Sequence, residues 1–186
     1  MSGTWFQTYH SGIFDFAAPS AEHLSLEVIA HALSMQCRYN GHCERFYSVA
    51  EHSVHVMARV AELRPLDWTA RRVALLHDAS EAVLGDIPSP LKRTGTFDEY
   101  RRLEREVQGM ILDKFLGFVT PADEIRAAVK LADMELLATE KAQIMAAEPR
   151  DWGLLPDPLD VTIFGWAPPT AEAEFLAAAE NMGLRR

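Results

Sequence analysis

His77 and Asp78 are adjacent in the apolar stretch ALLHDASEAVLGD, which spans residues 74–86. Burying two such polar side chains without partners would be costly, so the fold must supply either another side chain or a metal ion. Glu81 follows His77 by four residues, a spacing that places both on one face of a helix. Asp86 follows just beyond. This stretch therefore indicates a buried polar site with carboxylates beside it.

Two further candidate metal ligands lie in other apolar helical stretches, His52 in SVAEHSVHV and Asp133 in VKLADMEL. A ligand pair from one helix, completed by single ligands from two other helices, can form a metal site inside a helical bundle. Two imidazoles and two carboxylates suit a divalent ion better than a metal that prefers thiolates. Each residue also has a purely structural explanation. A lone core histidine is usually hydrogen-bonded, and Asp133 has Lys130 and Arg126 close by as basic partners.

The elements that must position these side chains are mostly helical. The apolar spacing of residues 25–37 predicts a helix, and Ser48 is expected to cap the next one, residues 49–63, with Glu51 as its capping-box partner. Further helices are expected at 66–84, 97–116, 122–147 and 171–183, with irregular segments at 85–95 and 148–170. Alternating aromatic and polar residues at 4–16 favour a short hairpin. We therefore predict an all-α fold with a short N-terminal β-hairpin.

The composition is that of one globular domain. The 186 residues are enough for a sizeable core, and we expect a single domain over 1–186 with its core motifs at about 25–145. The net charge of −9 disfavours duplex nucleic acid and anionic membranes as partners, but it allows a small phosphorylated ligand. Two cysteines, no visible signal peptide and no long apolar run together favour a cytoplasmic location.

Three segments carry a family resemblance: YSVAEHSVHV, ALLHDASEAVLGDIPSPLK and VKLADMELLATE, in that order. Together they resemble the HD-domain metal-dependent phosphohydrolases, and most of all the 5′-deoxynucleotidase-like branch. The chain also resembles certain phage triphosphohydrolases that act on deoxynucleoside triphosphates. The resemblance implies an HD-type helical bundle and an enzyme that hydrolyses phosphate esters. It covers about residues 25–145.

The resemblance also implies roles for individual residues. His52, His77, Asp78 and Asp133 would ligate one divalent metal ion per chain, which could be Mn, Co, Fe, Ni, Zn or Mg. Glu81 and Asp86 fall where the family keeps its catalytic carboxylates. The sequence CRY at 37–39 falls where the family has an arginine and an aromatic residue that touch phosphate and sugar. Tyr39 stands where the nearest deoxynucleotidases carry tryptophan, so the resemblance does not predict which sugar or base this protein prefers.

The residue types suit this chemistry independently of the resemblance. A bound divalent metal lowers the pKa of water from 15.7 towards roughly 7 to 9, which makes a nucleophile available. Glu81 could exchange a proton with that water or with the leaving oxygen. Arg38 could bind phosphate oxygens with its planar fork, while Lys92 would act as a point charge. Asp86 could orient a water or a basic side chain.

The histidines indicate one metal rather than two. All seven occur at or before residue 77, whereas two-metal relatives usually need further histidines after the HD pair. His55, one turn after His52, could support the site from outside or be an ordinary surface or core residue. Tyr39 and Tyr47 are either stacking partners for a base or sugar or plain core residues.

Three functions follow as alternatives. The leading one is hydrolysis of a deoxynucleoside 5′-monophosphate to nucleoside and phosphate. The second is hydrolysis of a deoxynucleoside triphosphate to nucleoside and tripolyphosphate, which would need more cations than Arg38, Lys92 and Arg93. The third, from another class, is a non-catalytic helical protein that binds metal or nucleotide. A homodimer is expected from the resemblance, and LLPDPLDVTIFGWAPPT (154–170) could cover either the protein's own core or a partner.

Overall fold

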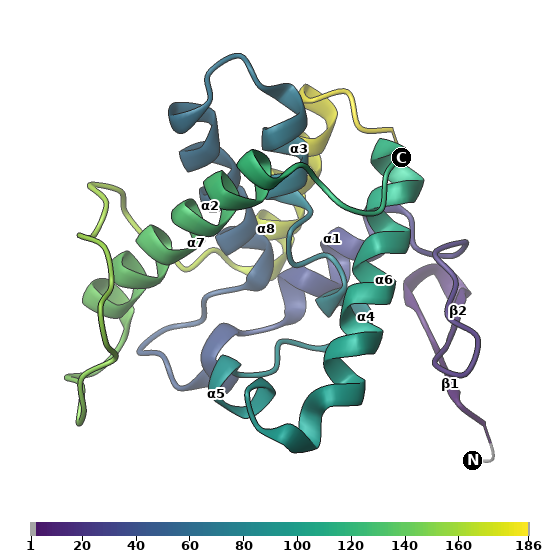
Figure 1. The fold of residues 1–186 in the computed structure, drawn as a ribbon, viewed down its shortest axis with the longest axis horizontal. Coiled ribbons are helices and arrows are strands. Elements are labelled where there is room, and N and C mark those ends of the chain that lie inside the picture. Colours follow the sequence, from purple (N-terminus) through teal and green to yellow (C-terminus); the bar gives the residue numbers. More distant parts are fainter. Residues whose placement is uncertain (1–2, 186) are drawn as a thin grey trace.

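The computed structural model describes residues 3–185 and is mostly helical, with a short N-terminal hairpin, as the sequence predicts (Figure 1). In chain order the elements are β1 (Trp5–Gln7), η1 (Tyr9–Ser11), β2 (Ile13–Asp15), α1 (Leu26–Met35), η2 (Arg38–Gly41), α2 (Val49–Leu63), α3 (Trp68–Leu75), α4 (Glu81–Leu84), α5 (Ser89–Lys92), η3 (Gly95–Phe97), α6 (Asp98–Leu116), α7 (Asp123–Ile144) and α8 (Pro168–Asn181), where η marks a short 3-10 helix.

The hairpin contributes one face to the core. β1 and β2 pair antiparallel with Phe6 opposite Phe14. Phe14 of β2 is buried in the core, whereas Ile13 beside it and all of β1, Trp5 included, are exposed, so only β2 places a side chain in the core. Figure 1 shows the hairpin on one side of the molecule, next to α6, with the segment after α7 on the opposite side.

α2 connects two parts of the core. It packs against α3, α7 and α8, while α1 packs along α8. Val49, at its beginning, belongs to an apolar cluster that includes Leu33 of α1 and Phe175 of α8. Val60, near its end, belongs to a second cluster that includes Leu136 of α7. A polar side chain between these two ends of α2 therefore lies where the two clusters meet.

The expected helix over 66–84 is broken, which corrects the prediction. α3 ends at Leu75, and residues 76–80 form turns before α4 begins at Glu81. Gln108 of α6 stabilises the break, because it accepts a hydrogen bond from the Ser80 N–H at 3.0 Å and donates one to the Leu76 carbonyl at 2.7 Å. Adjacent residues of a continuous helix point about 100° apart. The break releases His77 and Asp78 from that constraint, so both can face one site.

The other boundaries agree with the expected ones to within a few residues, with one addition. The segment predicted as a loop at 85–95 contains the short helix α5. Ser48 caps α2 as predicted, accepting a hydrogen bond from the Glu51 N–H at 3.0 Å. The Glu51 carboxylate, however, accepts hydrogen bonds from the backbone of residues 164–166, so the capping box is only half formed.

Residues 145–167 contain no regular element, in agreement with the expected irregular excursion. The described helices include none with the length and apolar character needed to span a bilayer.

Candidate metal centre

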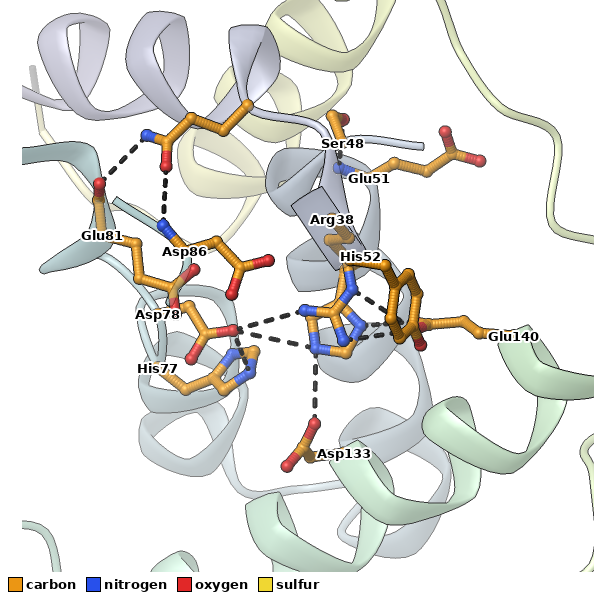
Figure 2. A network of polar contacts seen from close by, with 12 residues as sticks. Arg38, Ser48, Glu51, His52, His77, Asp78, Glu81, Asp86, Asp133 and Glu140 are labelled. Atoms are coloured by element: carbon orange, nitrogen blue, oxygen red, sulfur yellow. Dashed lines mark hydrogen bonds and ion pairs between the residues drawn. The ribbon is translucent and has the colours of Figure 1, made fainter. Parts of the chain in front are cut away.

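A cluster of His52, His77 and Asp133 lies where α2, α7 and the α3–α4 break meet (Figure 2). One ligand atom from each residue lies within 4.8 Å of the others. The Nε2 atom of His52 is 3.5 Å from Oδ1 of Asp133. Asp78 adjoins this cluster, with Oδ2 at 3.1 Å from His77 Nε2 and 3.9 Å from His52 Nε2. All four residues that the sequence singled out as ligands are thus brought together.

The Nε2 ring nitrogens at the centre lie close to carboxylates but are not hydrogen-bonded. The Nε2 atoms of His52 and His77 are buried and have no hydrogen-bond partner among the described residues. On its other side, the His77 ring is held by a contact of 2.8 Å between Nδ1 and the Ala74 carbonyl. An unpartnered buried nitrogen is costly, and a metal ion is a natural partner for it. The His52, His77 and Asp133 cluster could therefore hold a metal ion.

The acidic members of the centre favour their charged forms. Burial alone would raise the pKa of Asp78, but His77 and then His52 outweigh it and hold that pKa below its ordinary value. Burial likewise opposes the ionisation of Asp133, yet His52 and His77 lower its pKa. Asp133 also pairs with Lys130 at 2.8 Å through Oδ2, which leaves Oδ1 towards His52. Metal ligands of this type must be deprotonated, so both carboxylates are suited to the role.

Glu140, which the sequence reading did not single out, lies behind His52. It is fully buried on α7, and its Oε1 is 2.6 Å from His52 Nδ1. Burial raises its pKa, but Arg38 and His52 outweigh that effect and lower the value to about 2. Burial and Arg38 lower the pKa of His52, whereas Glu140 and Asp133 raise it, with a net result of about 9.

Arg38 and Tyr39 lie beside the centre, but both side chains are already hydrogen-bonded to Glu140. Arg38 donates from Nε and Nη2 to Glu140 at 3.3 and 3.2 Å, so one edge of its guanidinium fork is already occupied. Its Nη1 lies 3.8 Å from Asp78 Oδ2. The Tyr39 hydroxyl also donates to Glu140. Tyr47 is fully buried and donates to the same carboxylate at 2.9 Å, which excludes it as a surface for stacking a base.

Glu81 and Asp86 lie beside the centre, as Figure 2 shows. Glu81 is 5% exposed, and its Oε2 has no hydrogen-bond partner among the described residues. Burial raises its pKa, and the charges of Asp78 and Asp86 raise it further. Burial also raises the pKa of Asp86. Gln36 links the two, because its side chain donates to the Glu81 carbonyl at 3.0 Å and accepts from the Asp86 N–H at 3.1 Å.

The remaining candidates, Lys92 and His55, have contact partners outside the centre. Lys92 is 3.8 Å from Glu81 Oε1, but it donates to Glu104 at 2.8 Å, so its charge is shared. His55 has its described contacts outside the cluster: its Nε2 is 3.7 Å from Glu51 and its ring stacks on Trp166 at 5.6 Å between centroids.

The chain has close relatives among proteins that have not been characterised. It is 32% identical over 152 residues to the uncharacterized protein YfdR of Escherichia coli strain K12, a match that covers 82% of this chain and 79% of the relative. It is 34% identical over 190 aligned positions to an uncharacterized protein of Rhodobacter capsulatus, covering 95% of this chain and 94% of the relative. Comparison with models of known protein families gives no match.

Proposed function

The chain belongs to the family that includes the uncharacterized protein YfdR, and we propose that it is a metal-dependent phosphohydrolase of the HD type that acts on nucleotides. The observation that carries the proposal is the pair of buried, unpartnered imidazole Nε2 atoms of His52 and His77 beside the Asp78 and Asp133 carboxylates. The comparisons give no activity for the relatives, so the proposal rests on the chemistry of this site and on the motif resemblance.

His52, His77, Asp78 and Asp133 would hold one divalent metal ion. When bound, such an ion supplies a coordination position for a phosphate oxygen and lowers the pKa of water. The ligand set of two imidazoles and two carboxylates is compatible with Mn, Co, Fe, Ni, Zn or Mg. Because the thiols of the chain are not among these ligands, the site does not favour a metal that requires sulfur.

Glu81 is the proposed general acid or base. Its carboxylate is buried, has one oxygen without a hydrogen-bond partner among the described residues, and lies next to Asp78. A carboxyl group with a raised pKa is suited to giving and taking a proton near neutral pH. Asp86, beside it, would orient a water or the Lys92 ammonium group.

The substrate phosphate would be bound by Arg38 through the Nη1 side of its guanidinium group, since the Nε edge is occupied by Glu140. Lys92 would add a second, partly neutralised positive charge. Two cations already paired with carboxylates suit one phosphate better than the more highly charged triphosphate tail. We therefore favour a deoxynucleoside 5′-monophosphate as substrate.

The triphosphohydrolase alternative keeps the same centre and differs in how many substrate phosphates are bound beside it. The non-catalytic alternative would need neither a buried Glu81 whose Oε2 has no hydrogen-bond partner among the described residues nor Asp86 beside it. Both alternatives are addressed by one experiment with the purified protein.

The experiment is to incubate dAMP and dATP separately with the protein and Mn²⁺ or Co²⁺, and to identify the products. Phosphate from dAMP with dATP unchanged is the expected result. Tripolyphosphate from dATP would favour the triphosphohydrolase. A protein that binds Mn²⁺ but hydrolyses neither nucleotide would contradict the proposed function and favour the non-catalytic alternative.

A further inference from the structure

Glu140 lies on α7 seven residues after Asp133, so the two carboxylates are on about the same side of that helix. Its Oε1 faces His52 Nδ1 at 2.6 Å and accepts from Tyr47 at 2.9 Å. Its Oε2 accepts two hydrogen bonds from Arg38 and one from Tyr39. A carboxylate offers about four acceptor positions, so this one is saturated by its neighbours.

This saturation fixes the orientation of His52. An ionised carboxylate only accepts hydrogen bonds, so the Nδ1 atom of His52 must donate to it. When a metal ion displaces the proton from the opposite ring atom, Nε2, that atom supplies the lone pair that binds the metal. That atom faces Asp133 and Asp78 at 3.5 and 3.9 Å and has no hydrogen-bond partner among the described residues. A carboxylate behind a histidine in this way holds the ring in the geometry that a metal requires.

The same carboxylate fixes Arg38. Because Nε and Nη2 are held by Glu140, the guanidinium plane cannot rotate freely, and Nη1 is left 3.8 Å from Asp78. The backbone beside it is constrained as well: Tyr39 and Asn40 both have positive φ values, 57° and 52°. Non-glycine residues rarely adopt that conformation, and the Tyr39–Glu140 hydrogen bond helps to hold it.

We propose that Glu140 is a positioning residue that aims two different groups at the metal centre, the Nε2 atom of His52 and the Nη1 atom of Arg38. The inference rests on the metal site of the proposed function. A purely structural Glu140 would affect the stability of the fold and leave the metal affinity of the folded protein unchanged. Metal affinity is therefore the property that separates the two roles.

The test compares Glu140→Gln with Glu135→Gln in the full-length protein. Glu135 is a matched control, because it lies on the same helix and, like Glu140, bonds an arginine, in this case Arg59 of α2 at 2.7 Å, whereas none of its described hydrogen bonds or ion pairs reaches the centre. Each protein is freed of metal and titrated with Mn²⁺, and the free ion is measured by electron paramagnetic resonance. We expect Glu140→Gln to weaken Mn²⁺ binding roughly 10–100-fold. We expect the control to remain within about twofold of the unaltered protein.

A folded Glu140→Gln protein that binds Mn²⁺ as tightly as the unaltered protein would overturn the inference. If that variant does not fold, the ring orientation can be read in the unaltered protein loaded with Zn²⁺, from the long-range proton–nitrogen couplings of the histidines. We expect the His52 proton on Nδ1 and the metal on Nε2. The opposite arrangement would overturn the inference without any substitution.

The two proposals fail in different ways. An unaltered protein that binds no Mn²⁺ overturns the metal centre and, with it, both proposals. A loss of affinity in Glu140→Gln, in a protein that hydrolyses neither dAMP nor dATP, supports the positioning role and contradicts the proposed function.

Discussion

Glu81 and His77 are four residues apart, yet their side chains have different surroundings. The Nε2 atom of His77 lies 3.1 Å from Asp78, inside the group of candidate ligands. Glu81 lies outside that group. Its ion-pair partner is Lys92, whose Nζ is 3.8 Å from Glu81 Oε1. We therefore expect His77 to govern metal content and Glu81 to govern the chemical step.

Replacing Glu81 by Gln should leave the metal in place and lower turnover by about 10²–10⁴-fold, the usual effect of removing a general acid or base. His77→Ala is the contrasting variant, because it removes a ligand and should lose both metal and turnover. The measurement is Mn²⁺ bound per chain, together with the rate of nucleotide hydrolysis. A fully active Glu81→Gln protein would contradict the role assigned to Glu81.

At the level of the elements, α3 illustrates how local chemistry fixes a helix end. Asp67 caps α3, since its side chain accepts a hydrogen bond from the Ala70 N–H at 2.8 Å. It also accepts one from Arg64 at 2.8 Å. The Ala70 hydrogen bond, supported by Arg64, lowers the pKa of Asp67. The capping hydrogen bond of Asp67 and its negative charge thus both stabilise the start of α3, and substitutions of Asp67 can separate the two effects.

Asp67→Ala should cost about 1 kcal/mol of stability at neutral pH, whereas Asp67→Asn should cost less because its amide oxygen still caps the helix. The pKa of Asp67 is lowered in the folded protein, so its charge adds stability above the unfolded pKa of about 3.9. That stability is lost as the pH falls through the folded pKa. Urea unfolding at pH 7 and at successively lower pH should show the unaltered protein and Asp67→Asn converging. An unchanged difference would contradict the charge effect.

The helices show which parts of the fold and of the site could be predicted from the sequence. Helix positions could be predicted because apolar residues recur at helical spacing and because Ser48 is a recognisable cap. The α3–α4 break could not, since it depends on Gln108, which is 28 residues further along the chain. Glu140 was missed because a single glutamate in a helix is usually solvated, and only the fold brings Arg38 and His52 to it. Its place at the end of VKLADMELLATE was the available signal.

At the scale of the whole molecule, the irregular segment 145–167 is mostly exposed but packs on the protein's own core around Ile163. Ile163 is buried, and its N–H donates to Gln143 at 2.9 Å while its carbonyl accepts from Arg45 at 2.8 Å. The part of this stretch around Ile163 thus packs on the protein's own core, and a role of its exposed residues at a partner surface stays a prediction. Phe164 remains 61% exposed. The expected homodimer stays a prediction, and light scattering on the purified protein would contradict it by showing a monomer.

A further attachment of this segment is Glu51, a fully buried carboxylate of α2. It accepts hydrogen bonds from the backbone N–H groups of Phe164, Gly165 and Trp166 at 3.0, 2.9 and 2.6 Å. Hydrogen bonds to a charged group contribute about 1.5–3 kcal/mol each, and removing their acceptor leaves three N–H groups to find new partners. Glu51 therefore links the C-terminal part of the chain to the helix that carries His52.

We expect Glu51→Ala to lower stability by at least about 3 kcal/mol, which for a chain of this length corresponds to a fall of roughly 6–12 °C in Tm. Glu51→Gln should have a smaller effect, because one amide oxygen can still accept. Glu62→Gln is the matched control: it changes an exposed glutamate of the same helix and should shift stability by no more than about 0.5 kcal/mol. The measurement is thermal unfolding followed by circular dichroism. A Glu51→Ala protein with the Tm of the control would show that the segment is held by its apolar contacts and not by this carboxylate.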